Sequence, residues 1–134
     1  METPRPSPTI ALVTLARSAE VELARLLEPA GLSVRKFAIL QRLAQVPGAT
    51  PADLARTVGV SEADAAPLVR ALSTTGFIRR GRDGALAVTD AGAAALRRVE
   101  ASLTDLDARV FAGRDALAAE LLEATSRPRD EPRD

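Results

Sequence analysis

The sequence predicts a mostly α-helical chain that carries one small β-hairpin. Apolar residues recur at helical spacing over most of the chain. Ser and Thr residues that suit helix starts alternate with Gly and Pro residues that suit helix ends. One segment, residues 77–88, instead places two short runs of strand-forming residues on either side of a glycine-containing turn. The length of 134 residues fits one domain.

The first helix is expected from about Pro8 to Glu28, before the breaker Pro29-Ala30-Gly31. Its apolar stripe consists of Leu12, Leu15, Ala16, Ala19, Leu23, Leu26 and Leu27. Ile10, Val13 and Val21 lie off that stripe, and a helix that is apolar on more than one side needs more than one packing partner.

Three shorter helices are expected at about residues 33–46, 51–58 and 62–75, capped by Ser33, Thr50 and Ser61. In the first of them the inward residues are expected to be Phe37, Leu40, Leu43 and Ala44. Thr50 and Asp53 have capping-box spacing, and Ser61 with Asp64 resembles a second capping box. Two helices joined by a glycine turn at Gly59 form a helix-turn-helix pattern.

Residues 77–80 and 85–88 read as two strands joined by Gly81-Arg82-Asp83-Gly84, a wing that follows the helix-turn-helix. A long helix is expected from Asp90 to Ala112, with a heptad-like seam formed by Leu96, Val99, Leu103, Leu106 and Val110. Gly113 ends it, and a last helix carries Leu117, Leu121 and Leu122. The long helices have more apolar surface than a small winged domain can cover, which predicts a homodimer.

The expected organisation has five parts. They are a disordered N-terminus (1–8), an N-terminal dimerisation helix (9–30), a winged helix-turn-helix domain (31–92), C-terminal dimerisation helices (93–125) and a disordered tail (126–134). The dimer interface is expected to contain Leu12, Leu15, Leu23, Leu103, Leu106, Val110, Leu117 and Leu121.

The composition argues against an enzyme. The chain lacks Cys and His, which removes thiolate nucleophiles, imidazole bases and the usual zinc ligands. We therefore expect no metal and no cofactor. No apolar run approaches the roughly 20 residues of a membrane span, and the N-terminus does not resemble a signal peptide, so a cytoplasmic location is expected.

The charge is balanced overall but not along the chain. Residues 31–92 hold eight basic and five acidic groups, a net +3, and the remainder of the chain is therefore −3. A mildly basic centre between acidic ends suits a nucleic-acid-binding module, although an ordinary solvated surface gives a similar imbalance.

Three stretches together resemble the multiple-antibiotic-resistance regulator (MarR) family. They are GLSVRKFAILQRLA (31–44), TPADLARTVGVSEADAAPLVRALSTTGFIRR (50–80) and LAVTDAGAAALRR (86–98). The family-like features are Gly31-Leu32, Leu54-Ala55, the entry into the wing from Leu72 to Arg79, and the exit from Val88 to Gly92. The resemblance covers about Thr9 to Thr125.

The resemblance implies a ligand-responsive repressor that acts as a homodimer on double-stranded operator DNA. The fourth helix would enter the major groove, the wing would reach a minor groove, and a small-molecule effector would sit between the DNA-binding and dimer parts. Residues expected to contact DNA are Lys36, Ser61, Asp64, Arg70, Arg79, Arg80 and Arg82. A ligand pocket between the first, second and long helices would be lined by Leu, Val and Ala, near Arg17 or Arg25.

Three features depart from the family pattern. Glu62 and Asp64 place two carboxylates where a groove-entering helix usually presents donors to a polyanion. Pro67 either interrupts the fourth helix or lies in the first turn of a helix that starts late. The wing is short. An alternative therefore stays open: a MarR-fold dimer that has lost operator binding and binds small molecules or partner proteins, or, as the last choice, is an enzyme.

Overall fold

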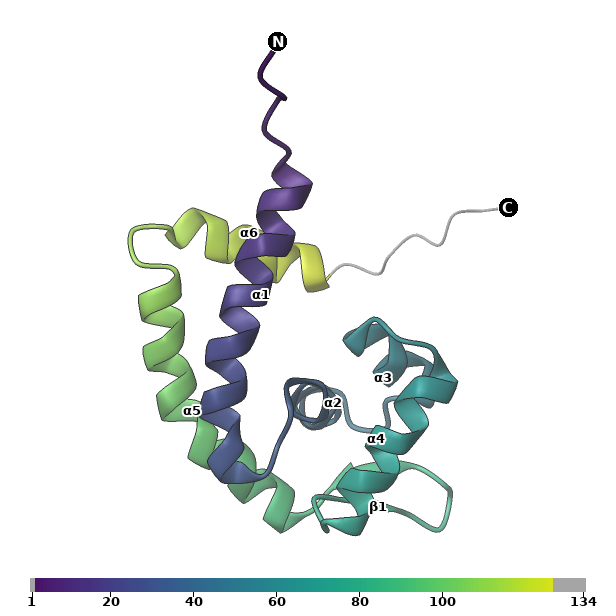
Figure 1. The fold of residues 1–134 in the computed structure, drawn as a ribbon. Coiled ribbons are helices and arrows are strands. Elements are labelled where there is room, and N and C mark those ends of the chain that lie inside the picture. Colours follow the sequence, from purple (N-terminus) through teal and green to yellow (C-terminus); the bar gives the residue numbers. More distant parts are fainter. Residues whose placement is uncertain (1, 127–134) are drawn as a thin grey trace, which may run out of the picture.

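The computed structural model describes residues 2–126. It is mostly helical, with a two-stranded antiparallel hairpin after the fourth helix (Figure 1). In chain order the elements are α1 (Pro8–Leu27), the 3-10 turn η1 (Glu28–Ala30), α2 (Val34–Gln45), α3 (Pro51–Val58), α4 (Glu62–Thr74), β1 (Ile78–Arg80), β2 (Leu86–Val88), α5 (Asp90–Val110) and α6 (Asp115–Ser126). The predicted fold class and element order are confirmed. None of the helices within residues 2–126 is long and apolar enough to cross a membrane.

Side-chain caps fix where the helices of the central region begin. The Ser33 hydroxyl accepts a hydrogen bond from the Lys36 backbone N–H at 3.2 Å. In α3 the capping box is complete, because Asp53 N–H donates to Thr50 Oγ1 and Thr50 N–H donates to Asp53 Oδ2, both at 3.2 Å. The predicted caps at Ser33 and Thr50 are therefore confirmed.

The second capping box is half formed. Ser61 Oγ accepts from Asp64 N–H at 3.1 Å, but no reciprocal bond joins the Asp64 carboxylate to the Ser61 backbone. The prediction from the Ser61-Asp64 spacing was therefore wrong in this respect, and the Asp64 carboxylate stays exposed to solvent.

Pro67 lies inside α4, which starts at Glu62. The alternative of a helix that starts late is therefore wrong. Because proline has no N–H, the Ala63 carbonyl loses its usual partner four residues later. The Pro67 ring itself is exposed.

The core is formed where α2 meets α3, α4, the hairpin and the first half of α5. Its fully buried large side chains are Leu27, Ile39, Leu40, Leu43, Leu54 and Leu72. Phe37 is buried as predicted, but Ala44 is exposed. The prediction for Ala44 was wrong because its face of α2 borders an open groove rather than the core.

The start of α5 is tied to the base of the hairpin. Thr89 N–H donates to the Phe77 carbonyl at 3.0 Å, and the Thr89 hydroxyl donates to the Gly76 carbonyl. A Cβ atom at Gly92 would lie 2.2 Å from the Phe77 oxygen and 2.8 Å from Val88 Cγ1. Glycine at residue 92 therefore allows α5 and the wing to approach closely.

The two ends of the chain form a separate layer of long helices. α1 packs along α5, and α6 turns back from the far end of α5 (Figure 1). Within residues 2–126, α6 has no buried residue and packs extensively against no other element. This part of the molecule lacks a core of its own.

Candidate DNA-binding surface and ligand groove

The helix-turn-helix is formed by α3 and α4. Gly59 ends α3 with a left-handed φ of 71°, and its N–H donates to the Arg56 carbonyl at 3.1 Å. Val60 N–H then bonds the Ala55 carbonyl at 3.1 Å, which turns the chain into the Ser61 cap. Ala55 and Ala65 are both buried, so α4 packs on α3 through small side chains and leaves its opposite face exposed.

The exposed face of α4 is acidic at its N-terminal end. Ser61, Glu62 and Asp64 are exposed in the first turn, and Arg70 is exposed farther along the helix. The carboxylates suit the positive end of the helix dipole. They also weaken the attraction of this end for a phosphate backbone, so Arg70 is the one basic side chain that α4 offers.

The wing carries the three predicted arginines, all exposed. Arg80 is held against the turn, because its Nη1 donates to the Gly84 carbonyl at 3.0 Å. The turn is closed by a bond from Gly81 N–H to the Ala85 carbonyl at 2.8 Å and one from Ala85 N–H to Asp83 Oδ1 at 3.0 Å. Arg79, Arg80 and Arg82 thus lie on one hairpin whose strand β1 contacts α4, with Arg79 and Arg80 on opposite faces of that strand.

Lys36 is placed differently. It lies half-buried in the first turn of α2, and within residues 2–126 its side chain forms no hydrogen bond or ion pair with α4 or the wing.

Asp53 lies on α3 beside this surface, and its neighbours lower its pKa. The Thr50 hydroxyl and then the Thr50 backbone N–H lower the pKa of Asp53, and the Arg56 guanidinium lowers it further. The carboxylate is thus held ionised while it caps α3 and pairs with Arg56. Asp53 thus stabilises the start of α3, and its ion pair with Arg56 lies at the surface.

The predicted interface residues differ in exposure within one chain. Leu12 and Leu15 are each 55% exposed and Leu117 is 39% exposed, whereas Leu106 is 5% exposed. Leu23, Leu103, Val110 and Leu121 are half-buried. Leu106 therefore has little surface left for a second chain, because it is buried within its own.

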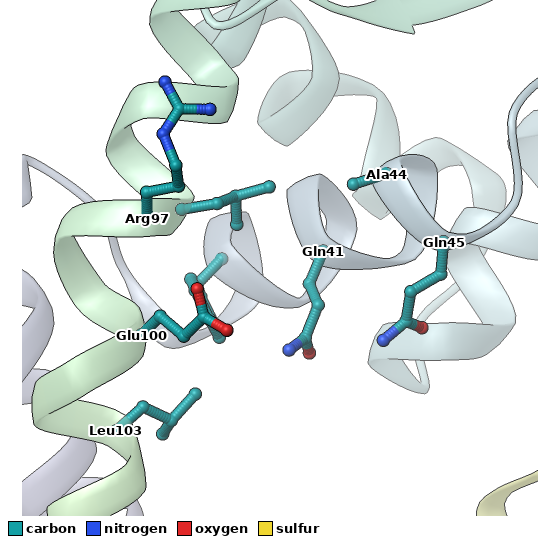
Figure 2. Close-up of a pocket in the computed structure, with 8 residues that line it drawn as sticks. Gln41, Ala44, Gln45, Arg97, Glu100 and Leu103 are labelled. Atoms are coloured by element: carbon teal, nitrogen blue, oxygen red, sulfur yellow. The ribbon is translucent and has the colours of Figure 1, made fainter.

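A groove of about 260 Å³ separates α2 from α5. Its apolar lining consists of Phe37, Ala44, Leu96 and Leu103, and its polar lining of Gln41, Gln45, Arg97 and Glu100 (Figure 2). The sequence predicted a pocket between the first, second and long helices, lined by Leu, Val and Ala near Arg17 or Arg25. This groove has no lining residue from α1, and Arg25 lines a separate hollow with Glu22, Leu26 and Arg109. The spacing of residues 37, 41, 44 and 45 on one helical face was the signal that could have identified the α2 wall.

Comparison with known proteins finds relatives that have a helix-turn-helix and the same fold. The MarR family model matches residues 32–84. The HTH-type transcriptional repressor Rv2887 of Mycobacterium tuberculosis is 34% identical over 97 residues, which cover 68% of this chain and 70% of the relative. The structure of Rv2887 with DNA is 27% identical, with a TM-score of 0.74 over 92% of this chain and 100% of the other.

Two further solved structures extend the comparison. Rv2887 with salicylic acid has a TM-score of 0.75 at 26% identity, covering 90% of this chain and 96% of the other. The reduced form of MarR from E. coli has a TM-score of 0.76 at 16% identity, covering 93% of this chain and 96% of the other, which shows a shared fold.

The α3–α4 pair, the wing and the flanking helices define a winged helix-turn-helix transcription regulator. This chain belongs to the MarR family. Its function is therefore transcriptional regulation through DNA binding, and the family consists of regulators rather than enzymes.

Proposed function

We propose that the protein is a homodimeric, cytoplasmic repressor that binds operator DNA and is released by a small-molecule effector. The observation that carries the proposal is the rigid joint between the wing, α4 and α5 through Gly76, Phe77, Thr89 and Gly92. This joint holds the exposed face of α4 and the wing arginines in one fixed arrangement. Such an arrangement suits one helix in a major groove and a hairpin at a neighbouring minor groove.

The proposed contacts divide into two kinds. Arg82, at the wing turn, would enter the minor groove, and Arg70, Arg79, Arg80 and Lys36 would bind phosphates. Ser61 and Asp64 would face base edges from the first turn of α4. The phosphate contacts would supply most of the affinity, because the first turn of α4 itself is acidic.

Dimer formation is proposed from the exposed apolar residues on α1 and α6. Ile10, Leu12, Leu15 and Leu122 are 66%, 55%, 55% and 73% exposed in one chain. Leaving these side chains in water is unfavourable, and α6 lacks a packing partner within residues 2–126. A second copy of the same helices would cover these side chains and would pack against α6.

Effector binding is proposed for the groove between α2 and α5. One wall of the groove belongs to the helix-turn-helix region and the other to the long helix, so a bound molecule would change their relative position. Relatives with this fold have been solved with small molecules, namely Rv2887 with salicylic acid and CouR of Rhodococcus jostii RHA1 with p-coumaroyl-CoA.

The proposal is tested by fluorescence anisotropy with the DNA that flanks the gene of this protein and with an unrelated duplex as the control. Specific binding should exceed binding to the control by roughly 10³-fold and weaken as salt rises. Arg82→Ala and Arg70→Ala should each weaken binding and reduce the salt dependence by about one counterion. Arg17→Ala, an exposed change on α1, is the matched control and should leave affinity unchanged.

Equal affinity of the folded protein for the flanking DNA and the unrelated duplex would contradict operator binding at that site. It would favour the alternative of a MarR-fold protein that no longer reads DNA, for which the acidic first turn of α4 is the supporting observation.

A further inference from the structure

The groove between α2 and α5 presents an unusual set of polar side chains for a site that would bind an acid. Gln41 and Gln45 lie four residues apart on α2 and extend from its groove side (Figure 2). Across the groove, Glu100 extends from α5 toward α2, above Leu103 in the view of Figure 2. The Arg97 guanidinium points along α5, away from Gln41 and Gln45. The charge directed into the groove is therefore the carboxylate.

The Glu100 carboxylate has no partner among residues 2–126, where its side chain forms no hydrogen bond or ion pair. An ionised carboxylate accepts hydrogen bonds and donates none, whereas each glutamine amide both donates and accepts. A cationic N–H group placed between them would donate charge-assisted hydrogen bonds to the Glu100 carboxylate and to the amide oxygens of Gln41 and Gln45. An anion in the same position would be repelled by Glu100.

The remaining lining defines the rest of the ligand. Phe37, Leu96 and Leu103 supply an apolar surface beside the polar groups, and the volume of about 260 Å³ admits one small ring system. The groove thus suits a compact molecule with a flat apolar body and a positively charged or N–H-rich head.

We propose that the effector of this regulator is a small cationic aryl compound, of the amidine or amine class, whose head group binds Glu100. The inference rests on the proposed function, in which this groove holds the effector. It differs from the carboxylic acids with which the relative Rv2887 has been solved, salicylic and p-aminosalicylic acid.

The test uses benzamidine, benzamide and benzoate, which share a ring and have similar size but carry positive, zero and negative charge. Binding to the full-length protein is measured by isothermal titration calorimetry without DNA. We expect benzamidine to bind at least 10-fold more tightly than benzoate, with benzamide between them. Glu100→Gln should remove the preference for benzamidine, whereas Arg97→Gln, which removes a positive charge from the groove lining, should not reduce it.

Asp105→Asn is the matched control, because it removes one exposed carboxylate from α5 at a residue outside the groove. A loss of the preference in Asp105→Asn equal to that in Glu100→Gln would overturn the proposal, since general electrostatics would then explain it. Tighter binding of benzoate that depends on Arg97, or no binding of any probe at millimolar concentration, would overturn it as well.

Operator binding without a probe is measured on the same preparations. If the protein binds operator DNA but does not prefer benzamidine over benzoate, the proposed ligand class is overturned and the proposed repressor function is not affected. Absence of operator binding would contradict the function itself, whatever the probes do.

Discussion

Hydroxyl caps fix the first residues of α2, α3 and α4. Ser33, Thr50 and Ser61 each accept a backbone N–H three residues later, because a cap depends on four consecutive residues and little else. The reciprocal hydrogen bond from the Ser61 backbone to the Asp64 carboxylate was also expected from the spacing, but it does not form. The spacing permits the bond but does not require it, and the carboxylate remains in water instead.

Gly92 illustrates a residue whose role could not be predicted from its neighbours in sequence. It resembled a family signature, but its physical reason is the Phe77 carbonyl, which lies fifteen residues earlier in the chain. The contact exists only when the wing and α5 are packed together. The helix and turn propensities of the residues next to Gly92 therefore cannot predict this contact.

Gly92→Ala is expected to lower the free energy of unfolding by about 1–3 kcal/mol, because the new Cβ would overlap the Phe77 oxygen. The helical propensity of alanine acts in the opposite direction by up to ~1 kcal/mol. Urea unfolding followed by circular dichroism measures the change. Ala101→Gly, at an exposed site of α5, is the control and should cost no more than ~1 kcal/mol. Unchanged or increased stability of Gly92→Ala would contradict the close approach.

At the level of elements, the order and type of the α-helices and strands were predictable, because capping residues, glycines and prolines mark most of their ends. The groove was not. Its α2 face could be read from residues 37, 41, 44 and 45, but the partner face on α5 depends on how two helices far apart in sequence are packed. For the same reason Ala44 was assigned to the core and is found at the groove.

Pro67 makes α4 less stable than its other residues would allow. Pro67→Ala is expected to raise the free energy of unfolding by about 1–3 kcal/mol, because it restores a hydrogen bond to the Ala63 carbonyl at an exposed site. Thermal unfolding at fixed protein concentration measures the effect. Ala63→Ser, in the same exposed turn, is the control and should change stability by less than ~1 kcal/mol. A loss of stability in Pro67→Ala would mean that α4 needs the altered geometry that proline imposes.

For the molecule as a whole, a single chain gives the winged domain a buried core but leaves large apolar side chains of the terminal helices exposed. The prediction of surplus apolar surface came from helical periodicity alone. Which residues supply it depended on packing, since Leu106 is buried against its own chain while Leu122 is exposed.

Replacing Leu12 and Leu15 together with Glu is expected to shift the protein from dimer to monomer, because four charges would then face each other across a two-fold interface. Sedimentation velocity measures the change in mass. Val46→Glu, an exposed apolar residue at the end of α2, is the control and should leave the mass unchanged. Retention of the dimer by the double variant would place the interface elsewhere.

The absence of extensive packing around α6 has a consequence for how the chain acquires its structure. The core around α2 is made of residues of one chain, from Leu27 to Val99, and can form within one molecule. If the N-terminal half of α1 and α6 become ordered by meeting a second copy, that step is bimolecular, and its rate rises with protein concentration. Refolding should then show a fast phase independent of concentration, followed by a slower one that accelerates as the protein becomes more concentrated.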